Sequence, residues 1–328
     1  MQIQQNAPFT DEQKKLSFVI TTYNISPDML RQCVESILSL SLTPEEREII
    51  LVDDGSDESP LVGLKDYIND LIYVRQENKG VSGARNIGIR LASGSHIQFI
   101  DGDDHLISEA YEHCLSIWKN NNPDIIAFDR TSGEEKEPEI TVLGPVEGVE
   151  YMLHNNIYGA IWGYIFRRSM LISLKFTIGV DYGEDEEFTP QLLLRAESMY
   201  ATNAKAYFYR LHDTSITHKK EDKDKLKRLD DSFNVICRLQ YKADRLPTKE
   251  REALSRRVAQ LTMDYIYNVI ILTHDVDTLE SHVERLHEKG LFPLPDKDYT
   301  RKYKWFRWTV STALGRKLLL YSLKNRDK

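Results

Sequence analysis

The chain has 328 residues, of which 41% are hydrophobic and 29% charged, and a formal net charge of −8. This composition is typical of a soluble globular protein. The length suits one large domain with an accessory region, or two domains. The net negative charge disfavours nucleic acid as the main partner, because nucleic-acid-binding domains usually carry a basic excess. Residues 297–328 depart from this average, since ten Lys/Arg and two Asp give them +8 and leave −16 for the remainder.

The cysteines and the apolar segments indicate in which cellular compartment the protein is expected. Cys33, Cys114 and Cys237 form neither a CxxC pair nor a Cys/His cluster, which disfavours a zinc site and indicates buried, reduced thiols. Residues 1–15 lack the apolar core of a signal peptide, and the apolar run at 269–272 is far too short to span a bilayer. The sequence therefore predicts a cytoplasmic protein.

Short apolar runs alternate with helical patterns through the first part of the chain. Residues rich in β-branched and aromatic side chains predict buried strands at 16–23, 48–52, 72–74, 96–100 and 124–128. Apolar residues at helical spacing predict helices at 28–40, 60–70, 81–92 and 108–120. This alternation predicts an α/β fold in which these strands form one parallel sheet with right-handed crossovers.

The pattern changes twice further along. Residues 132–145 contain charges, prolines and glycines, and predict a loop or a β-excursion. Residues 150–210 are expected to complete the same domain with mixed structure, whereas 220–290 carry helical patterns. We therefore expect a first domain over residues 1–218 and a helical C-terminal region over 219–328.

Three carboxylates, those of Asp101, Asp103 and Asp104, directly follow the predicted strand at 96–100. Ligands of open α/β sheets bind at the carboxyl ends of the strands. Carboxylates crowded there repel one another, and a divalent cation such as Mg²⁺ or Mn²⁺, shared with substrate phosphates, would relieve the repulsion. The alternative is an acidic turn that binds nothing, which we disfavour because three adjacent carboxylates at the end of a buried strand do not add stability.

A second acidic pair, Asp53 and Asp54, ends the strand at 48–52. A carboxylate there could accept hydrogen bonds from a base or a ribose, or the pair could simply form an Asp-rich turn. Thr21 and Tyr23 occupy the same predicted edge of the sheet one strand earlier. Tyr23 could stack on a base or be an ordinary rim aromatic.

Three further segments allow two interpretations each. Residues 78–89 contain three glycines without the GxGxxG or Walker pattern; Lys79 and Arg85 could reach a diphosphate, while the glycines could serve helix packing. The acidic segment 183–188 begins a predicted helix at 185–197, where it could cap the helix or supply a base. His212 could contact a metal or a diphosphate, or be structural.

Taken in order, these segments resemble the family 2 inverting glycosyltransferases of bacterial polysaccharide type, which have a GT-A fold. The resemblance covers about residues 16–218 and lies in TTYN at 21–24, VDDGS at 52–56, NKGVSGARNIGI at 78–89, FIDGDD at 99–104, WGYIFRRSML at 162–171, GEDEEF at 183–188 and YRLHDTSIT at 209–217. It implies a mostly parallel sheet flanked by helices, with residues 1–218 as the nucleotide-sugar-binding and catalytic domain.

The resemblance also implies a nucleotide-diphosphate sugar donor, with UDP as the expected carrier, and a saccharide or lipid-linked saccharide as acceptor. The residues expected to bind the donor are Thr21, Tyr23, Asp53, Asp54, Lys79, Arg85, Asp101 and Asp103. Those expected to hold a divalent metal, Mn²⁺ or Mg²⁺, are Asp103 and Asp104, with His212 as a further candidate. Asp185 would deprotonate the acceptor in a metal-assisted single displacement with inversion, and Trp162 and Glu184 would lie near the acceptor.

The chain departs from the family pattern at a central position, and other functions compete with sugar transfer. Tyr164 stands where the family often has a basic residue after the Trp-Gly pair. A non-catalytic nucleotide-sugar or glycan-binding module is the main alternative, and it has little need of Asp185. A nucleotidyltransferase is disfavoured because no glycine-rich, basic signature lies near the first strand, and a dehydrogenase because the first turn, TYNIS, has no glycine.

The tail combines basic, aromatic and apolar residues. Basic and aromatic residues alternate over 301–308, and apolar residues recur about every four positions at Phe306, Val310, Leu314, Leu318 and Tyr321. This spacing predicts an amphipathic helix. The helix could bind the anionic inner surface of a membrane, which would suit a lipid-linked acceptor, or it could pack on the protein's own acidic body.

Overall fold

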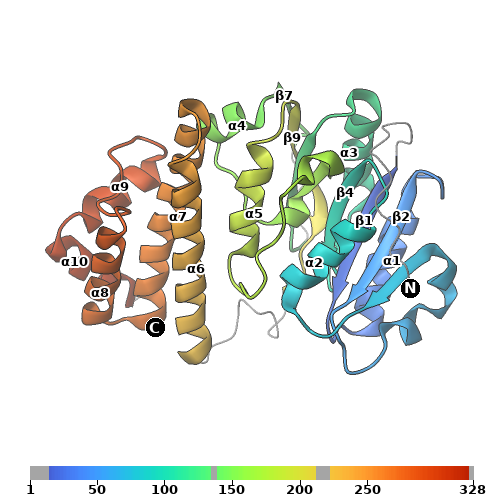
Figure 1. Cartoon of the computed structure of the whole chain (residues 1–328), viewed down its shortest axis with the longest axis horizontal. Coiled ribbons are helices and arrows are strands. Elements are labelled where there is room, and N and C mark those ends of the chain that lie inside the picture. Colours follow the sequence, from blue (N-terminus) through green and yellow to red (C-terminus); the bar gives the residue numbers. More distant parts are fainter. Residues whose placement is uncertain (1–14, 134–138, 212–221, 325–328) are drawn as a thin grey trace. The chain divides into compact units, whose positions relative to one another are not determined.

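The computed structural model describes residues 15–133, 139–211 and 222–324 (Figure 1). The chain divides into two compact units that interleave along the sequence. The first unit takes in residues 1–148, 158–179 and 191–212, and the second takes in 149–157, 180–190 and 213–328. The second unit is thus assembled from two short internal segments as well as the C-terminal part of the chain.

Four parallel strands form one half of the sheet in the first unit. In spatial order they are β3 (Leu71–Arg75), β2 (Arg47–Asp53), β1 (Leu16–Thr22) and β4 (His96–Asp101). Each agrees with its predicted strand to within one residue at either end. β1 lies between β2 and β4 and is buried along its whole length, as expected of a central strand in a sheet covered on both faces.

The other half of the sheet is mixed. β8 (Tyr164–Arg167) pairs antiparallel with β4, and β6 (Ile125–Thr131) pairs antiparallel with β8. β9 (Met199–Phe208) runs parallel to β6, whereas β5 (His105–Leu106) and β7 (Val142–Val146) run antiparallel to β9. The predicted α/β class is confirmed. The prediction that β6 continues the parallel run is wrong, because β8, from later in the chain, occupies the position beside β4.

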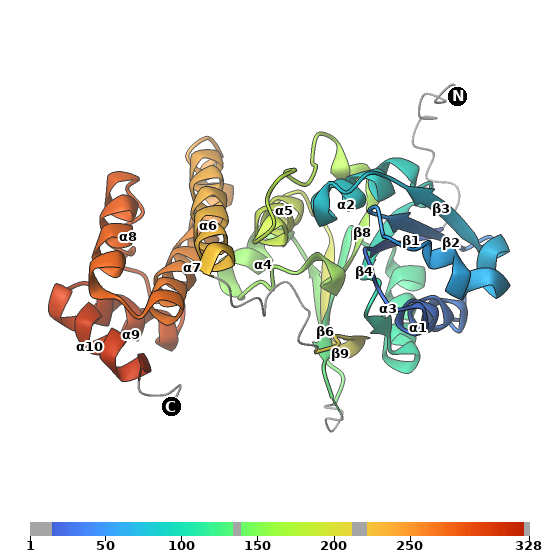
Figure 2. The ribbon, with the colours of Figure 1, turned by 90° about the horizontal axis from the view of Figure 1, so that it is seen from below.

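Helices cover both faces of this sheet (Figure 2). α1 (Pro27–Leu38) and α3 (Ser108–Asn121) share a core with Phe18 and Ile20 of β1. Successive strand residues point to opposite faces, so Val19 lies on the other face, where α2 (Gly80–Leu91) packs. A Cβ on Gly88 of α2 would lie 2.1 Å from Val19 Cγ1, so this glycine permits the close approach of helix and strand.

The predicted helix at 60–70 has a different geometry. It is a 3₁₀ helix, η1 (Pro60–Asp70), with non-helical backbone angles at Leu64. A Cβ on Gly63 would lie 2.5 Å from Pro27 Cβ, so the glycine lets this segment approach the start of α1. Glycine in the middle of the segment is also poor in helix propensity, which accounts for the irregular helix.

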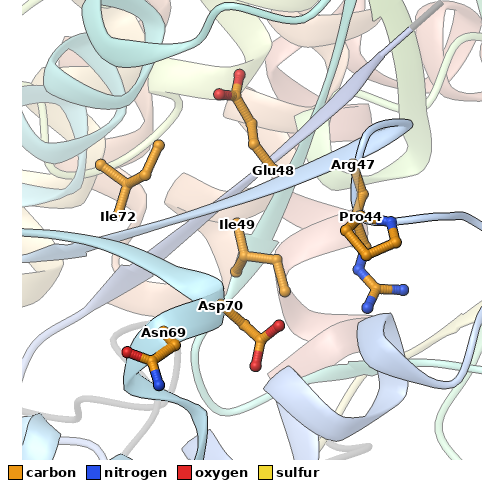
Figure 3. A pocket seen from close by; sticks show the side chains of 7 residues that line it. All are labelled: Pro44, Arg47, Glu48, Ile49, Asn69, Asp70 and Ile72. Carbon is orange, nitrogen blue, oxygen red and sulfur yellow. The ribbon is translucent and has the colours of Figure 1, made fainter.

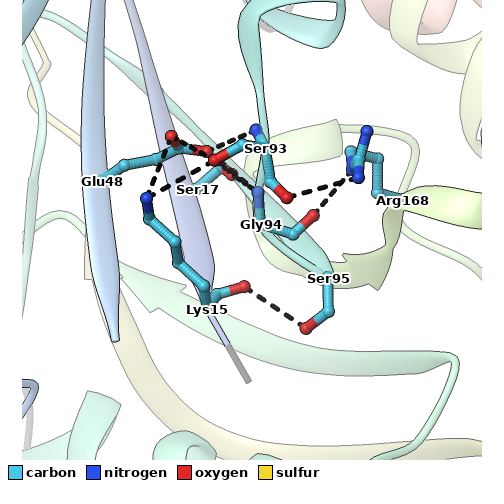
Figure 4. A network of polar contacts seen from close by, with 7 residues as sticks. All are labelled: Lys15, Ser17, Glu48, Ser93, Gly94, Ser95 and Arg168. Atoms are coloured by element: carbon cyan, nitrogen blue, oxygen red, sulfur yellow. Dashed lines mark hydrogen bonds and ion pairs between the residues drawn. The ribbon is translucent and has the colours of Figure 1, made fainter. Parts of the chain in front are cut away.

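A buried carboxylate ties the amino ends of β1 and β2 to the loop before β4 (Figure 4). Glu48 accepts hydrogen bonds from Ser93 N (2.6 Å), Ser93 Oγ (2.8 Å), Gly94 N (3.0 Å) and the Ser17 hydroxyl. Lys15 Nζ lies 3.5 Å from Glu48 Oε2. Burial alone would raise the pKa of Glu48, but the hydrogen bonds outweigh burial and lower this pKa. The charged carboxylate therefore stabilises the edge of the sheet opposite Asp53.

The second unit is helical. Its elements are most of α4 (Gly148–His154), the first part of α5 (Glu184–Leu193), α6 (Asp222–Ala243), α7 (Thr248–Thr273), α8 (Val276–Glu288), α9 (Arg301–Val310) and α10 (Ala313–Lys324). Two short 3₁₀ helices, η2 (Ile161–Gly163) and η3 (Arg168–Leu171), belong to the first unit. No helix in the described part of the chain has the length and apolar character needed to cross a membrane.

The tail differs from the single amphipathic helix that the sequence predicts. One helix ends at Val310 and a second begins at Ala313, so the apolar positions do not form one stripe. Phe306 and Val310 are buried, whereas Leu314, Leu318 and Tyr321 are exposed. The cysteine prediction also needs a correction, since Cys33 and Cys114 are buried but Cys237 is only half-buried.

Replacing Glu48 with Gln should lower the free energy of unfolding at neutral pH by about 1–3 kcal/mol, because an amide cannot accept all the hydrogen bonds that the carboxylate accepts. The lowered pKa fixes the sign of the pH dependence. The carboxylate's contribution is present above the ordinary Glu pKa and is lost as the pH falls through the lower folded-state value. Urea unfolding of wild type and Glu48→Gln should therefore converge at acid pH.

The exposed Glu77 supplies the control. Glu77→Gln should stay within about 0.5 kcal/mol of wild type at every pH. A deficit in Glu48→Gln that persists unchanged into acid would contradict the stabilising role of the charge.

Candidate functional site

The parallel register of β1 brings acidic strand ends together at one edge of the sheet. Thr22 of β1 pairs with Asp53 of β2, and Thr21 pairs with Asp101 of β4. The backbone N–H of Asp54 donates to the carbonyl oxygen of Thr22 at 2.9 Å. Residues of three neighbouring strands therefore meet at the carboxyl edge, where ligands of α/β sheets bind.

Asp53 at the end of β2 and Asp54 after it both accept hydrogen bonds from nearby loops. Asp53 is fully buried, and its Oδ1 accepts a hydrogen bond from Ser56 N at 2.8 Å. Asp54 Oδ1 accepts hydrogen bonds from Gln76 Nε2 (2.6 Å) and from Lys79 N (2.9 Å). Asp53 thus makes the contact of the Asp-rich turn that the sequence allowed as an alternative, whereas Asp54 joins the end of β2 to Gln76 and to Lys79, the residue before α2.

Two predicted donor-binding residues extend into solvent. Tyr23, just beyond β1, is 49% exposed, and the side chain of Lys79, immediately before α2, is exposed. Thr21, by contrast, is buried, and its Oγ1 lies 3.5 Å from Asp101 Oδ1. Tyr23 and Lys79 are therefore accessible to a ligand, while Thr21 supports the carboxylate beside it.

Asp101 pairs with a buried arginine. Arg85 of α2 is 3% exposed, and its Nη2 lies 3.1 Å from Asp101 Oδ1. The Arg85 guanidinium lies over the rings of Phe176 (5.3 Å) and Phe99 (5.9 Å). Burial raises the pKa of Asp101, although the charge of Arg85 acts in the opposite direction. Arg85 and Asp101, each predicted to bind the donor, are thus in direct contact.

Asp104 is the most perturbed carboxylate of this edge. It is 2% exposed; its Oδ2 accepts a hydrogen bond from Tyr207 Oη (2.8 Å), and its Oδ1 accepts one from Arg210 N (2.7 Å). Burial, followed by the charge of Asp101, raises the pKa of Asp104 to about 8. A carboxyl group held in this way is stabilised by a proton or by a nearby cation.

Arg210 connects this loop to α1, and the sequence analysis did not identify it. Its Nε donates to the carbonyl oxygen of Asp103 (2.8 Å), and its Nη2 donates to Gln32 Oε1 (2.6 Å). Tyr207, at the end of β9, was missed as well. A local signal for Arg210 exists, because it stands two positions before the predicted metal ligand His212 in the segment YRLH at 209–212.

The oxygen ligands that the carboxylates of this edge offer fit a hard cation such as Mg²⁺ or Mn²⁺ only in part. Asp101, Asp103 and Asp104 offer carboxylate oxygens, the ligands that Mg²⁺ and Mn²⁺ prefer. Among residues 15–133, 139–211 and 222–324, no group of three or more His, Cys, Asp and Glu is arranged to hold a metal ion. A cation here would therefore take further ligands from substrate phosphates and water. His212 lies outside the described residues.

Aromatic rings surround Trp162. Its ring, 4% exposed, stacks on Tyr207 with centroids 4.4 Å apart and planes at 11°. Tyr158, 51% exposed, lies 5.3 Å from Trp162, and the Arg130 guanidinium lies 4.7 Å from the Tyr209 ring. Trp162 is thus mostly covered, whereas Tyr158 offers the more accessible ring of this cluster.

The predicted base lies in the second unit. Gly183 adopts φ +87° in the turn before α5, a conformation that favours glycine. Glu184 and Asp185 follow in the first turn of α5 and are half-buried. Asp101, Asp103 and Asp104 belong to the first unit.

Two arginines of the long helices hold this turn. Glu187 receives two hydrogen bonds of 2.8 Å from Arg238 of α6, through Nε and Nη2. Glu186 forms an ion pair with Arg257 of α7. The helical region therefore fixes the residues that directly follow Asp185.

A small pocket lies elsewhere on the first unit (Figure 3). It has a volume of about 160 Å³ and is lined by Pro44, Arg47, Glu48, Ile49, Asn69, Asp70 and Ile72. Arg47, Glu48 and Ile49 are the first residues of β2, at the opposite end of the strand from Asp53. The pocket is therefore separate from the carboxylate edge.

Comparison with known proteins places these features in a family. The model of glycosyl transferase family 2 matches residues 17–177, which include β1, β2, β4 and their acidic ends. The chain belongs to glycosyltransferase family 2.

Relatives and a solved structure agree with the family 2 assignment. The uncharacterized glycosyltransferase EpsJ of Bacillus subtilis is 29% identical over 62% of this chain and 62% of its own. The poly(ribitol-phosphate) beta-glucosyltransferase of Bacillus spizizenii is 29% identical over 60% of this chain and 32% of its own. The chain thus matches less than two thirds of either relative's length. S. aureus TarS in complex with UDP-GlcNAc shares the fold, with a TM-score of 0.71 and 16% identity, over 95% of this chain and 91% of that chain.

The ion pair between Arg238 and Glu187 should couple α6 to α5. A double-mutant cycle with Arg238→Met and Glu187→Met should give a coupling free energy of about 1–3 kcal/mol, because either single change leaves the other charge without its partner. Chemical unfolding of the four proteins measures this coupling.

An exposed pair on the same unit supplies the control. Lys304 and Asp298 lie 3.0 Å apart, with side chains 60% and 68% exposed, and should couple by less than about 1 kcal/mol. Equal coupling in both cycles would show that the Arg238 pair adds nothing beyond an ordinary surface contact.

Proposed function

We propose that the protein transfers a sugar from a nucleoside diphosphate donor, expected to be a UDP-sugar, to a saccharide or lipid-linked saccharide of the cell envelope. The observation that carries the proposal is the carboxylate edge formed by half-buried Asp101 and buried Asp104, together with Arg85 and Arg210. Membership of family 2 supports sugar transfer. The TarS neighbour, which is similar in fold alone, was solved with UDP-GlcNAc.

The donor would bind along the carboxyl ends of β1, β2 and β4. Tyr23 and Lys79 are exposed there and would contact the nucleoside and the diphosphate. Asp54 would accept hydrogen bonds from the base or the ribose. Arg85 neutralises Asp101 and would allow the negative diphosphate to approach that carboxylate.

Asp103 and Asp104 would hold a divalent cation together with the donor's phosphates. When bound, such a cation supplies positive charge opposite the leaving diphosphate. The raised pKa of Asp104 fits this role, because the charged form gains most from a cation nearby. Tyr207 and Arg210 keep the Asp104 carboxylate oriented by donating hydrogen bonds to both of its oxygens.

Asp185 would act as the general base in a single displacement. Its carboxylate would take the proton of the acceptor hydroxyl while that oxygen forms the new bond to the sugar C1 atom. The bond from C1 to the diphosphate breaks at the same time, and its electron pair leaves with the diphosphate. Attack from the face opposite the leaving group inverts the anomeric configuration. The ion pairs of Glu186 and Glu187 would hold Asp185 in place.

Asp185→Asn should lower kcat/KM for transfer by about 10²- to 10⁴-fold, because an amide cannot accept the proton. The measurement is UDP release from a panel of UDP-sugars with saccharide acceptors, and NMR of the product should show the inverted anomer. UDP affinity, measured by calorimetry, should stay within about threefold of wild type.

Asp181→Asn removes a carboxylate from the same loop and is the matched control. Asp181 is exposed and pairs with Lys227, so its loss should leave transfer near the wild-type rate. Wild-type turnover in Asp185→Asn would remove Asp185 as the base.

Thermal unfolding separates the transferase from that part of the alternative in which the module binds glycan and no nucleotide. UDP should raise Tm by a few degrees, and more in the presence of Mn²⁺, because a ligand that binds only the folded state stabilises it. Asp104→Asn should lose the Mn²⁺-dependent part of this increase, whereas Asp129→Asn, an exposed change in the same unit, should keep it. No response of the folded wild type to any nucleotide would favour the binding module.

A further inference from the structure

α9 and α10 each carry one buried face and one exposed face. On α9, Tyr303, Phe306 and Val310 are buried to 3% exposure or less. On α10, Leu319 and Leu320 are similarly buried. These faces attach both helices to the second unit, so their orientation within that unit is fixed by packing rather than by the outer residues.

Polar contacts strengthen this attachment. Arg316 of α10 forms a two-bond ion pair with Glu280 of α8, and its Nη1 donates to Val310 O at 2.9 Å. Tyr303 Oη donates to the carbonyl oxygen of Pro295 at 3.0 Å. The two helices are therefore held as part of the folded unit.

The outer faces of α9 and α10 carry large apolar and aromatic side chains whose exposure does not stabilise the folded protein. Trp305 and Trp308 of α9 are 56% and 75% exposed. Leu314, Leu318 and Tyr321 of α10 are 69%, 61% and 58% exposed. The α10 residues are spaced i, i+4 and i+7, so they lie on one side of that helix. Large side chains concentrated on outer helix faces mark an interaction surface.

Basic residues accompany these side chains. Residues 296–324 contain eight Lys/Arg and two Asp, a net charge of +6, in a chain whose overall charge is −8. Arg301, Lys302 and Lys304 stand next to the tryptophans, and Lys317 stands between the leucines; all four are exposed. The partner should therefore be anionic and should also accept apolar and aromatic side chains.

We infer that the outer faces of α9 and α10 bind an anionic lipid surface. Tryptophan and tyrosine favour the interface between lipid headgroups and acyl chains, and leucine reaches into the acyl region. Lysine and arginine are attracted to anionic headgroups within about a Debye length. A second copy of this chain fits less well, because a symmetric contact would oppose one basic face to another. The inference is independent of the proposed sugar transfer.

The sequence pattern alone placed this surface on different residues. It combined Phe306 and Val310 with Leu314, Leu318 and Tyr321 in one stripe, whereas the structure buries the first two. Trp305 and Trp308 take their place on the exposed side. The structure thus joins the two alternatives for the tail, since one face packs on the protein and the other is available to a membrane.

The test uses the full chain and vesicles of phosphatidylcholine, alone or mixed with phosphatidylglycerol. The protein should float with the mixed vesicles and not with pure phosphatidylcholine, and high salt should weaken binding. Brominated lipid should quench Trp305 and Trp308, whereas Trp118 and Trp162, which are buried, should keep their emission.

Two sets of variants separate the contribution of the tryptophans to vesicle binding from that of the lysines. Trp305→Ala with Trp308→Ala should weaken binding at least tenfold, while Val62→Ser with Ile172→Ser, both 66% exposed on the first unit, should not change it. Lys302→Gln, Lys304→Gln and Lys317→Gln together should weaken binding at least tenfold. The control set Lys65→Gln, Arg90→Gln and Lys289→Gln removes three exposed charges elsewhere and should have less than a threefold effect.

Three outcomes would overturn the inference. The first is failure of the folded wild type to bind mixed vesicles. The second is equal loss of binding in the test and control variants, which would indicate a general charge effect. The third is a concentration-dependent dimer that Trp305→Ala with Trp308→Ala dissociates, without any vesicle binding, which would assign the surface to a second copy of the chain.

Discussion

The pairing of β1 between β2 and β4 is the constraint on which the site depends. Parallel strands in this register all end at the same edge, so Thr21 stands beside Asp101 and Thr22 beside Asp53. The apolar residues of β1 secure this register, because a slip of one residue would turn Phe18 and Ile20 away from the core they share with α1 and α3. Hydrophobic packing therefore determines where the carboxylates gather.

Placing several carboxylates together at one edge of the sheet costs electrostatic free energy. Neighbouring groups offset this cost differently at each aspartate. Asp53 accepts hydrogen bonds from Ser56 N in its own turn and from Tyr73 Oη of β3, and Asp101 is paired with Arg85. Asp104 accepts two hydrogen bonds and still has a raised pKa. The charges of Asp53 and Asp101 are therefore compensated by neighbouring groups of the fold, whereas the charge of Asp104 is not fully compensated by the protein.

Local sequence patterns predicted the strands β1 to β4 and their acidic ends, because each strand is a short apolar run bounded by polar residues. Features that depend on long-range pairing were missed. The insertion of β8 beside β4 could not be predicted, because no local signal tells a strand which neighbour it will find. Arg210 stands near His212 in the sequence, but its contacts with Asp103 and Gln32 could not be predicted, since both partners are far away in the sequence. The break between α9 and α10 was missed because apolar spacing continues across it.

The interleaving of the two units has a consequence for how such a chain can change over time. The segment that bears Asp185 is encoded between two segments of the sheet unit, yet its neighbours Glu186 and Glu187 depend on arginines of α6 and α7. Recombination that exchanged the C-terminal helices as a cassette would separate these arginines from Glu186 and Glu187. The turn that bears Asp185 would therefore lose its ion pairs whenever the C-terminal helices were exchanged without it.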